Sequence, residues 1–292
     1  MLSSFPQEVL LCILEHLTET EISNISTCNE FLHRKTTSCR TSQWLYRALL
    51  SRRKFLLDTK IKDFDSITFN TYHQVLYKSL FKKYRILNNI ATCGKNLLKE
   101  ALVSYEWNTH DSGASFLGPS GTIQTCLLKE KSLMCVKVSC TFNTNASNPI
   151  ALLKNVENHH LFEAELVHQK IQSVVDSNTT VVHRTYPHTQ LCLLVSNSHD
   201  SDGTYYQTQH SISLENIQDH PSLKRMVEVV TGKRWTINVV GSGYVVSPID
   251  TTSCTVTSVL QVQYTPSFQN AEFQTFITRA RAVILHRLKE AM

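Results

Sequence analysis

The chain has 292 residues, of which 41% are hydrophobic and 18% are charged. This length exceeds one average domain, and the composition is that of a folded globular protein, so it excludes a fibrous or intrinsically disordered chain. The formal net charge of +5 is concentrated in the first third of the chain, where Lys and Arg outnumber Asp and Glu. We interpret the basic stretches 47–54 and 77–85 as solvated helix faces, and we expect no nucleic-acid partner.

The cysteine pattern indicates a reducing compartment. The nine cysteines include no C-x-x-C spacing, so the sequence predicts neither a zinc cluster nor a disulfide framework. Reduced thiols are typical of the cytosol and the nucleus, where we place the protein. No apolar run reaches the roughly 18 residues that a membrane-spanning helix needs, so we expect no transmembrane segment.

The first predicted helix covers residues 3–17, SSFPQEVLLCILEHL. Ser4 followed by Gln7 resembles a capping box, and Pro6 suits the first turn of a helix. Shorter helices follow near Ile22 and around Trp44, which makes an apolar helical module of about fifty residues. A module of that size cannot bury enough surface to be stable alone, so it needs a partner or a neighbouring domain.

The order F-P-x-E-V-L-L-x-I-L-x-x-L, followed by Ile22 and a later Trp44-Leu45, resembles the F-box. The resemblance covers residues 3–50, in a predicted F-box domain of residues 1–50, and implies a three-helix module that binds the Skp adaptor of a Skp–cullin–F-box ubiquitin ligase. The residues that it implies for this contact are Phe5, Pro6, Glu8, Val9, Leu10, Ile13, Leu14, Leu17 and Ile22. The alternative is that these helices only cap the larger domain, because an apolar helix stripe is more often core than interface.

Helical periodicity continues from about residue 71 to 105, and an interruption at Gly94 predicts two helices rather than one. We assign residues 51–88 to a helical linker. After the Gly-, Ser- and Pro-rich segment 107–121, the pattern changes from helical to alternating. Such a change indicates a new architecture.

The second half of the chain predicts antiparallel strands, a short helix at 149–162 and a long closing helix at 267–292. The predicted strands are 122–129, 133–142, 170–177, 179–186, 190–197, 203–212, 235–248 and 254–264. In the last strand, alternation places Cys254 and Val256 on a face that we expect to be buried, and Thr255 and Gln261 on one that we expect to be wet. The glycines of GSG at 241–243 indicate a bulge or a sharp bend.

Residues 89–292 resemble a START domain, the steroidogenic-acute-regulatory-related lipid transfer module. The resemblance runs through segments 159–187, 191–213 and 239–263 and the closing helix. Phe162-Glu163 stands where the family typically has Trp-Asp, and Gly243, Tyr244 and Pro248 reproduce a Gly-Tyr-x-x-x-Pro strand. The resemblance implies a helix-grip fold, in which a curved antiparallel sheet wraps around the C-terminal helix and leaves a cavity for one lipid or sterol.

The cavity residues that we predict from this fold are Arg184, Tyr206, His210, Tyr244, Leu260, Val262, Phe276 and Ala280. The Arg-Asp pair that the family places near Thr189 and Gln190 is missing, and Arg184 or His210 would have to replace it. For these two we favour a solvent-facing arginine and a structural histidine. The pattern leaves open whether the large inward side chains line a cavity or fill it.

Catalytic and metal-binding patterns are absent from the sequence. There is no H-E-x-x-H, G-x-S-x-G or P-loop motif. The pairs His159-His160 and His183/His188 lack a Cys or carboxylate at ligand spacing, and we interpret them as surface residues. We therefore expect no metal, no cofactor and no catalysis.

The sequence as a whole predicts an α+β protein with a small N-terminal helical module and a helix-grip domain. We interpret it as the substrate-recognition subunit of a ubiquitin ligase, with Skp and cullin as partners and a protein target or lipid ligand on the START-like domain. One alternative is an intracellular lipid or sterol carrier whose N-terminal helices are structural. Another is a binding domain with a fully packed interior whose loops recognise the partner.

Overall fold

The structure is a computed structural model that describes residues 66–110, 117–128, 130, 132–187, 189–212, 217, 227, 237–263 and 271–292. The chain divides into two compact units, Met1–Arg85 and Ile86–Met292. The second unit contains the sheet and the closing helix. The predicted Skp-binding residues between Phe5 and Ile22, and the whole F-box-like segment 1–50, lie outside the described residues.

A single antiparallel sheet holds the ten strands of the described residues. The strands are β1 (Asn108–His110), β2 (Thr122–Leu128), β3 (Leu133–Phe142), β4 (His168–Val174), β5 (Thr179–Thr185), β6 (Gln190–His199), β7 (Tyr205–Ser211), β8 (Asn238–Val239), β9 (Ser242–Pro248) and β10 (Cys254–Gln263). Their order in the sheet is β1-β2-β3-β10-β9-β7-β6-β5-β4, and β8 pairs with β10. The last strand, β10, therefore lies between β3 and β9, and the first strand, β1, lies at one edge of the sheet.

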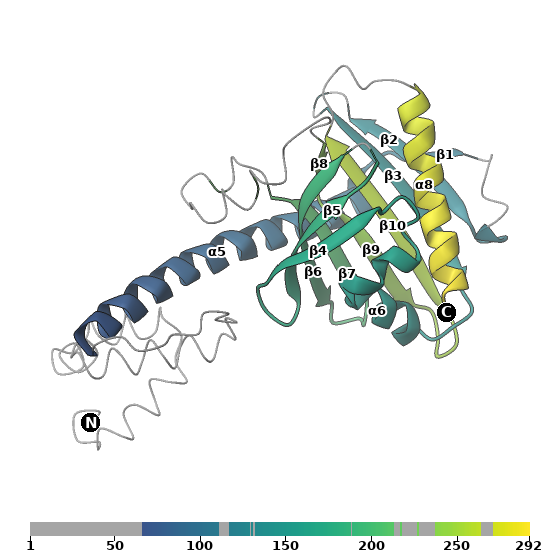
Figure 1. Ribbon diagram of the computed structural model, residues 1–292. Coiled ribbons are helices and arrows are strands. Elements are labelled where there is room, and N and C mark those ends of the chain that lie inside the picture. The colour runs from purple at the N-terminus through teal and green to yellow at the C-terminus, as the bar shows by residue number, and fades with distance from the viewer. Residues whose placement is uncertain are drawn as a thin grey trace. The chain divides into compact units, whose positions relative to one another are not determined.

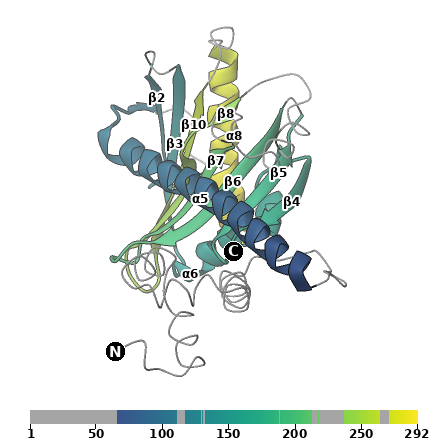
Figure 2. The same cartoon turned by 90° about the vertical axis from the view of Figure 1, so that its left-hand side faces the viewer.

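Helices cover both faces of this sheet. Helix α8 (Ala271–Glu290) lies along one face, here named the inner face (Figure 1). Helix α5 (Ser66–Ser104) crosses the opposite, outer face with its residues from Ile86 onward (Figure 2). Helix α6 (Ser147–Lys154) and the 3-10 helix η4 (Val156–Leu161) close one end of the inner face.

The inner core follows from the two-residue period of the strands. Alternate residues of β3 point to α8, and the buried residues of this layer are Met134, Val136, Val138, Cys140, Phe142, Ile277, Ala282, Leu285 and Leu288. Burial of each large apolar side chain contributes about 1.5–3 kcal/mol. The predicted grip of the sheet on the C-terminal helix is thus present in the structure.

The outer face is buried where α5 covers it, which corrects part of the expected wet face on β10; Thr255 is half-buried and Gln263 is exposed. Leu98 and Ala101 of α5 pack against Val245 and Val259. Gln261, which we expected to be solvated, is 0% exposed. The alternation along β10 alone predicted that Gln261 faces solvent, but α5 covers this residue. The Tyr105 hydroxyl of the following segment donates a hydrogen bond to Gln261 Oε1 at 3.1 Å.

The predicted break at Gly94 is wrong, because α5 is a single helix from Ser66 to Ser104. The predicted boundary between linker and sheet domain, at 88/89, consequently falls inside this helix. A Cβ atom at residue 94 would lie 3.2 Å from the His210 Cβ atom. Gly94 therefore lets the helix approach the sheet closely and does not end it.

Three further elements differ from the sequence prediction. The segment 149–162 divides into α6 and η4 because Asn155 is extended and its Oδ1 accepts a hydrogen bond from the Glu157 backbone N–H. The predicted strand 235–248 divides into β8 and β9 around Gly241, whose φ is +58°. The short strand β1 lies in a segment that we predicted as loop.

Candidate functional site

A cavity of about 150 Å³ lies between α8 and the inner face of the sheet. Most of its wall is apolar and comes from β6, β8, β10 and α8, including Leu191, Leu193, Val239, Leu260, Val262 and Ile284. Six polar side chains also line it, namely Glu163, Glu165, Tyr186, Thr189, Gln209 and Arg281. An apolar pocket with a few convergent polar groups is the usual form of a small-molecule site.

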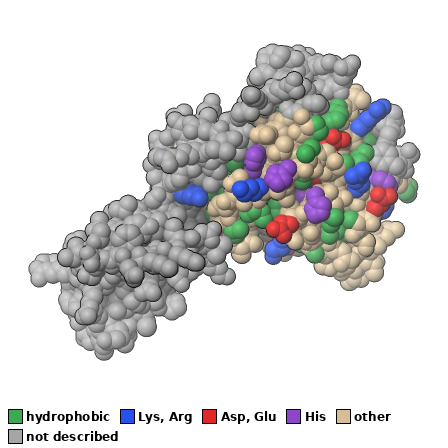
Figure 3. All heavy atoms as spheres, in the orientation of Figure 1, with side chains coloured by type: hydrophobic (Ala, Val, Ile, Leu, Met, Phe, Trp, Pro, Cys, Tyr) green, Lys and Arg blue, Asp and Glu red, His purple; other side chains and the backbone are tan. Residues whose placement is uncertain are grey.

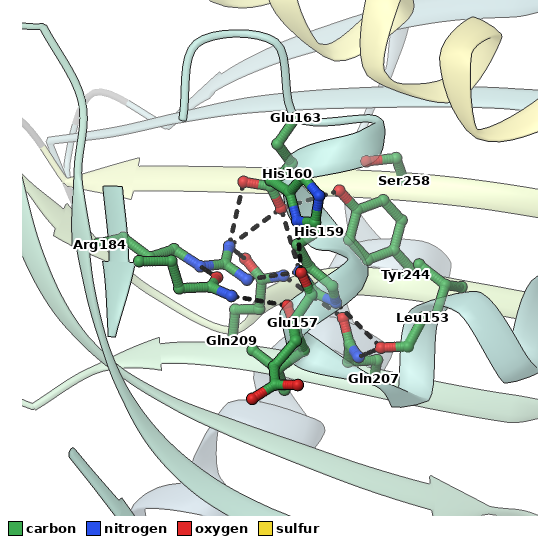
Figure 4. Close-up of polar contacts among 12 residues, drawn as sticks. Leu153, Glu157, His159, His160, Glu163, Arg184, Gln207, Gln209, Tyr244 and Ser258 are labelled. Atoms are coloured by element: carbon green, nitrogen blue, oxygen red, sulfur yellow. Dashed lines mark hydrogen bonds and ion pairs between the residues drawn. The ribbon is translucent and has the colours of Figure 1, made fainter. Parts of the chain in front are cut away.

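The polar end of the cavity contains a buried ion pair. Arg184 of β5 is 0% exposed and Glu163, just after η4, is 3% exposed. Arg184 Nη1 donates to both oxygens of Glu163, at 3.0 and 3.1 Å, and the two side chains point toward one another in Figure 4. The Tyr186 hydroxyl donates to Glu163 Oε2 at 2.9 Å, so this carboxylate is fully engaged by the protein.

The remaining donors of Arg184 are also satisfied. Its Nε donates to Gln169 Oε1 at 2.8 Å, and its Nη2 contacts His159 Nδ1. His159 Nε2 lies 2.9 Å from the Leu153 carbonyl oxygen, which requires a proton on Nε2. Arg184 Nη2 can only donate, so the Nδ1 atom that it contacts carries a lone pair. His159 therefore accepts from Arg184 as a neutral imidazole.

Burial and charge together set the ionisation of this cluster. Burial alone would raise the pKa of Glu163, but the charges of Arg184 and, to a lesser extent, Arg281 outweigh it and hold that pKa far below its usual range. Burial, followed by the charge of Arg184, lowers the pKa of His159. At neutral pH the pair is therefore Arg184 cation and Glu163 anion beside a neutral His159.

A second guanidinium reaches the same region from α8. Arg281 is 8% exposed, and its Nη1 donates to the hydroxyls of Tyr244 and Ser258, each at 3.4 Å. Its guanidinium carbon lies 5.9 Å from the centre of the Tyr244 ring. Unlike Arg184, Arg281 forms no ion pair with a carboxylate of the described residues.

The structure places six of the eight predicted cavity residues on the inner face. Leu260, Val262, Phe276 and Ala280 line the cavity itself. Arg184 and Tyr244 lie in the polar cluster around Glu163 (Figure 4). Whether any of them contacts a ligand stays a prediction.

Tyr206 and His210 lie on the outer face, so their assignment to the cavity is corrected. The Tyr206 ring lies under the Nζ atoms of Lys95 and Lys99 of α5, at 5.2 and 5.0 Å from the ring centre. His210 Nδ1 accepts from the Gly241 backbone N–H at 3.0 Å. The two-residue period of β7 explains the difference, because Gln207 and Gln209 of this strand take the inward positions.

Two other expectations about this region are wrong. Arg184 does not face solvent, and His159 is not a surface residue, since both are 0% exposed. The sequence interpretation placed these polar residues on the surface because their buried hydrogen-bond partners come from other elements and cannot be read from the local pattern. The cavity beneath α8 also decides a question that the sequence left open, because the interior of the domain is not fully packed.

Sequence reasoning did not identify Glu163 and Arg281 as site residues. Arg281 stands on the apolar stripe of α8 with Ile277 and Ile284, and a single cation on such a stripe was the available signal. Glu163 carried a weaker signal, since it follows Phe162 in a segment without alternation. Its buried partner, Arg184, lies on another strand, and only the fold brings the two together.

The described residues contain no group of three or more His, Cys, Asp and Glu that could hold a metal ion. No described helix is long and apolar enough to cross a membrane. On the face shown in Figure 3, the described basic, acidic and histidine side chains are interspersed among uncharged ones. This face therefore presents no single-sign patch among its described residues.

Comparisons with solved structures identify the fold. Human StAR-related lipid transfer protein 5 aligns with a TM-score of 0.57 and 10% identity over 71% of this chain and 96% of that one. The human StarD13 (DLC2) lipid transfer and protein localization domain aligns at 0.48 and 16% identity, over 67% and 94% of the two chains. Human STARD10 aligns at 0.48 and 15% identity, over 65% and 76%.

The likeness to the first of these structures shows that the described domain has the helix-grip fold of a START domain. A scan of the sequence against protein-family models finds no match. A search among curated proteins finds no significant relative. The START-like part of the sequence prediction is confirmed at the level of fold, and no finding supports an F-box in residues 1–50.

Proposed function

We propose that the START-like domain binds a small amphipathic lipid in the cavity between α8 and the inner face. The observation that carries this proposal is an apolar cavity that ends at a buried, fully hydrogen-bonded ion pair, Arg184 with Glu163. The apolar wall favours a ligand that leaves water, at about 25 cal/mol per Å² of buried surface. The fold of a protein named for lipid transfer gives further support.

The cavity is too small to enclose a whole lipid. An apolar cavity of about 150 Å³ holds a group the size of benzene, so a longer ligand has to extend beyond it. A second hollow of about 560 Å³ shares Phe276, Ala280 and Ile284 with the first. We infer that the polar end of the ligand lies near Glu163 and that its tail follows α8 toward this second hollow.

Native mass spectrometry of the purified full-length chain tests the proposal. We expect an added mass of a few hundred daltons, or uptake of a single-chain lipid supplied during purification. Ala280→Phe should fill the cavity and abolish uptake, whereas the matched variant Ala151→Phe, at an exposed position of α6, should retain it. If the unaltered chain takes up no lipid, or if Ala280→Phe binds as well as the unaltered chain, the proposal is wrong.

A second proposal concerns residues 1–50 and rests on the sequence pattern alone. The order of Pro6, Glu8 and the Leu/Ile ladder supports a Skp-binding F-box, which would make the chain a substrate receptor of a Skp–cullin ubiquitin ligase. Such a receptor acts by proximity, because a short tether raises the effective concentration of the target to the millimolar range. The lipid domain would then either recognise the target or sense a ligand that controls recognition.

Copurification with the Skp adaptor tests this second role. Replacing Pro6 and Leu10 by polar residues should abolish a one-to-one complex and leave lipid uptake unchanged. If the unaltered chain does not bind the adaptor, the role is excluded. Neither role requires bond chemistry, and the predictions that the chain is not an enzyme and acts in the cytosol or nucleus stay predictions.

A further inference from the structure

The buried end of the cavity carries more positive than negative charge. It holds the guanidinium groups of Arg184 and Arg281 and one carboxylate, Glu163, all less than a tenth exposed. His159 is neutral in this arrangement, because its Nδ1 accepts from Arg184 Nη2 while its Nε2 proton faces the Leu153 carbonyl. Glu165 also lines the cavity, but it is exposed, so solvent and salt screen its charge. Among the described residues, the buried groups therefore sum to one uncompensated cation.

Arg281 is the guanidinium that has no carboxylate partner of its own among the described residues. Glu163 already accepts both bonds from Arg184 and one from the Tyr186 hydroxyl. The contacts of Arg281 with the Tyr244 and Ser258 hydroxyls are 3.4 Å long and both come from Nη1, so they leave most of its five N–H donors unused by these groups. An unpaired buried charge is costly, and an anion that enters the cavity would remove this cost.

We propose that the cavity selects an amphipathic monocarboxylate, with an apolar chain along α8 and its carboxylate on Arg281. This inference rests on the proposed lipid-binding function and names the class of lipid. One negative charge matches the single excess positive charge, and two carboxylate oxygens match the fork of the guanidinium. A phosphate monoester carries more charge than the site compensates. Arg281 is thus the specificity-determining residue, and Arg184 with Glu163 positions the surrounding hydroxyls.

Isothermal titration of the full-length chain with ligands of one chain length tests this selection. Decanoate, decan-1-ol, decyl phosphate and decyltrimethylammonium share the same apolar part and differ only in the head group. We expect decanoate to bind at least about tenfold more tightly than each of the others, which corresponds to about 1.4 kcal/mol. If decan-1-ol or decyl phosphate binds as tightly as decanoate, the inference is wrong while lipid binding stands. If none of the four binds, the proposed function fails as well.

Variants of Arg281 assign the preference to this residue. Arg281→Met should reduce decanoate affinity at least about tenfold and leave decan-1-ol affinity unchanged, and Arg281→Lys should restore part of the preference because it keeps the charge. Arg287→Met, at an exposed position of the same helix, is the matched control and should bind decanoate normally. A preference for decanoate that survives in Arg281→Met would overturn the assignment. If that variant does not fold, Arg281→Gln provides the same comparison with a smaller change in polarity.

Discussion

The inner and outer faces of the sheet are each covered by one helix, and the two interfaces differ in how closely the helix approaches. On the outer face, Gly94 and Gly241 let α5 come within backbone contact of the strands, since a Cβ on Gly241 would lie 2.9 Å from the Gly94 carbonyl oxygen. On the inner face, α8 leaves a cavity of about 150 Å³.

The polar groups of the two interfaces differ in the same way. Beneath α5, Gln261 accepts from Tyr105 and donates to the Gly241 carbonyl oxygen at 2.7 Å, so its amide is satisfied by the protein. Beneath α8, Arg281 remains with two long contacts to hydroxyls. Close packing with satisfied polar groups is typical of a structural interface, whereas a hollow with an unpaired charge is typical of a binding site. The comparison therefore supports the proposal that the inner face, and not the outer one, binds a ligand.

The largest effect is expected at the buried ion pair of the inner face. Glu163→Gln leaves Arg184 buried without its anion, and we expect the free energy of unfolding to fall by about 3–5 kcal/mol. Urea-induced unfolding measures this change. Glu165→Gln, two residues further on and exposed, is the matched control and should change stability by less than about 0.5 kcal/mol. Equal effects of the two substitutions would contradict the burial of the pair.

The pH dependence of the same variant checks the charge of Glu163. Because the folded pKa of Glu163 is depressed, its contribution is fully present above the unfolded pKa of about 4.3 and is lost as the pH falls below that value. The difference in unfolding free energy between the unaltered chain and Glu163→Gln should therefore shrink below about pH 4. A difference that stays constant with pH would mean that the pKa of Glu163 is the same in the folded and unfolded states, so that Arg184 does not stabilise its charge.

On the outer face, Gly241→Ala should be strongly destabilising. A Cβ there would lie 2.5 Å from the Leu97 Cβ atom, and the φ of +58° adds strain for any residue with a side chain. We expect a loss of about 2–4 kcal/mol in unfolding free energy. Gly203→Ala shares the positive φ but has open surroundings, with Pro248 Cγ at 3.7 Å, and should cost only about 1–2 kcal/mol. Equal losses would show that α5 does not press on Gly241.

A smaller effect is expected at the hydrogen bond that fastens α5 to β10. Tyr105→Phe removes the donor to Gln261 Oε1 and should lower the unfolding free energy by about 1 kcal/mol at neutral pH. Burial raises the pKa of Tyr105 to about 12, so its contribution is present below the unfolded pKa of about 10 and is lost as the pH rises toward 12. Thermal unfolding at neutral and alkaline pH should show that the two proteins converge at high pH. A difference in stability that stays constant with pH would mean that the substitution acts through packing and not through the hydrogen bond of the hydroxyl.

Local patterns were sufficient to predict most of the sheet from the sequence. The hairpin of β2 and β3 and the strand β10 lie within a residue of their predicted bounds, because alternation is strong there. The site was harder to predict, because its ion pair joins Glu163, which follows η4, to Arg184 on β5. Alternation also cannot reveal a second covering layer, so it assigned Gln261 to solvent and Tyr206 to the cavity. Each of these errors concerns a contact between elements that are distant in the chain.

The predicted helix break at Gly94 disagrees with the structure, in which α5 is continuous. The stability effect of Gly94→Ala, the smallest effect that we predict, tests which is correct. In a continuous helix, Gly94→Ala gains about 1 kcal/mol of helix propensity. Its Cβ, however, would press on His210 at 3.2 Å, so the net change should stay within about 1 kcal/mol. In a His210→Gly background the Cβ atom on which it would press is gone, and the same substitution should stabilise the protein by about 1 kcal/mol. If Gly94 instead ended a helix in a left-handed conformation, Gly94→Ala would destabilise both backgrounds equally. Chemical unfolding of the four proteins in this cycle distinguishes the two structures, because only a continuous helix makes the effect at Gly94 depend on His210.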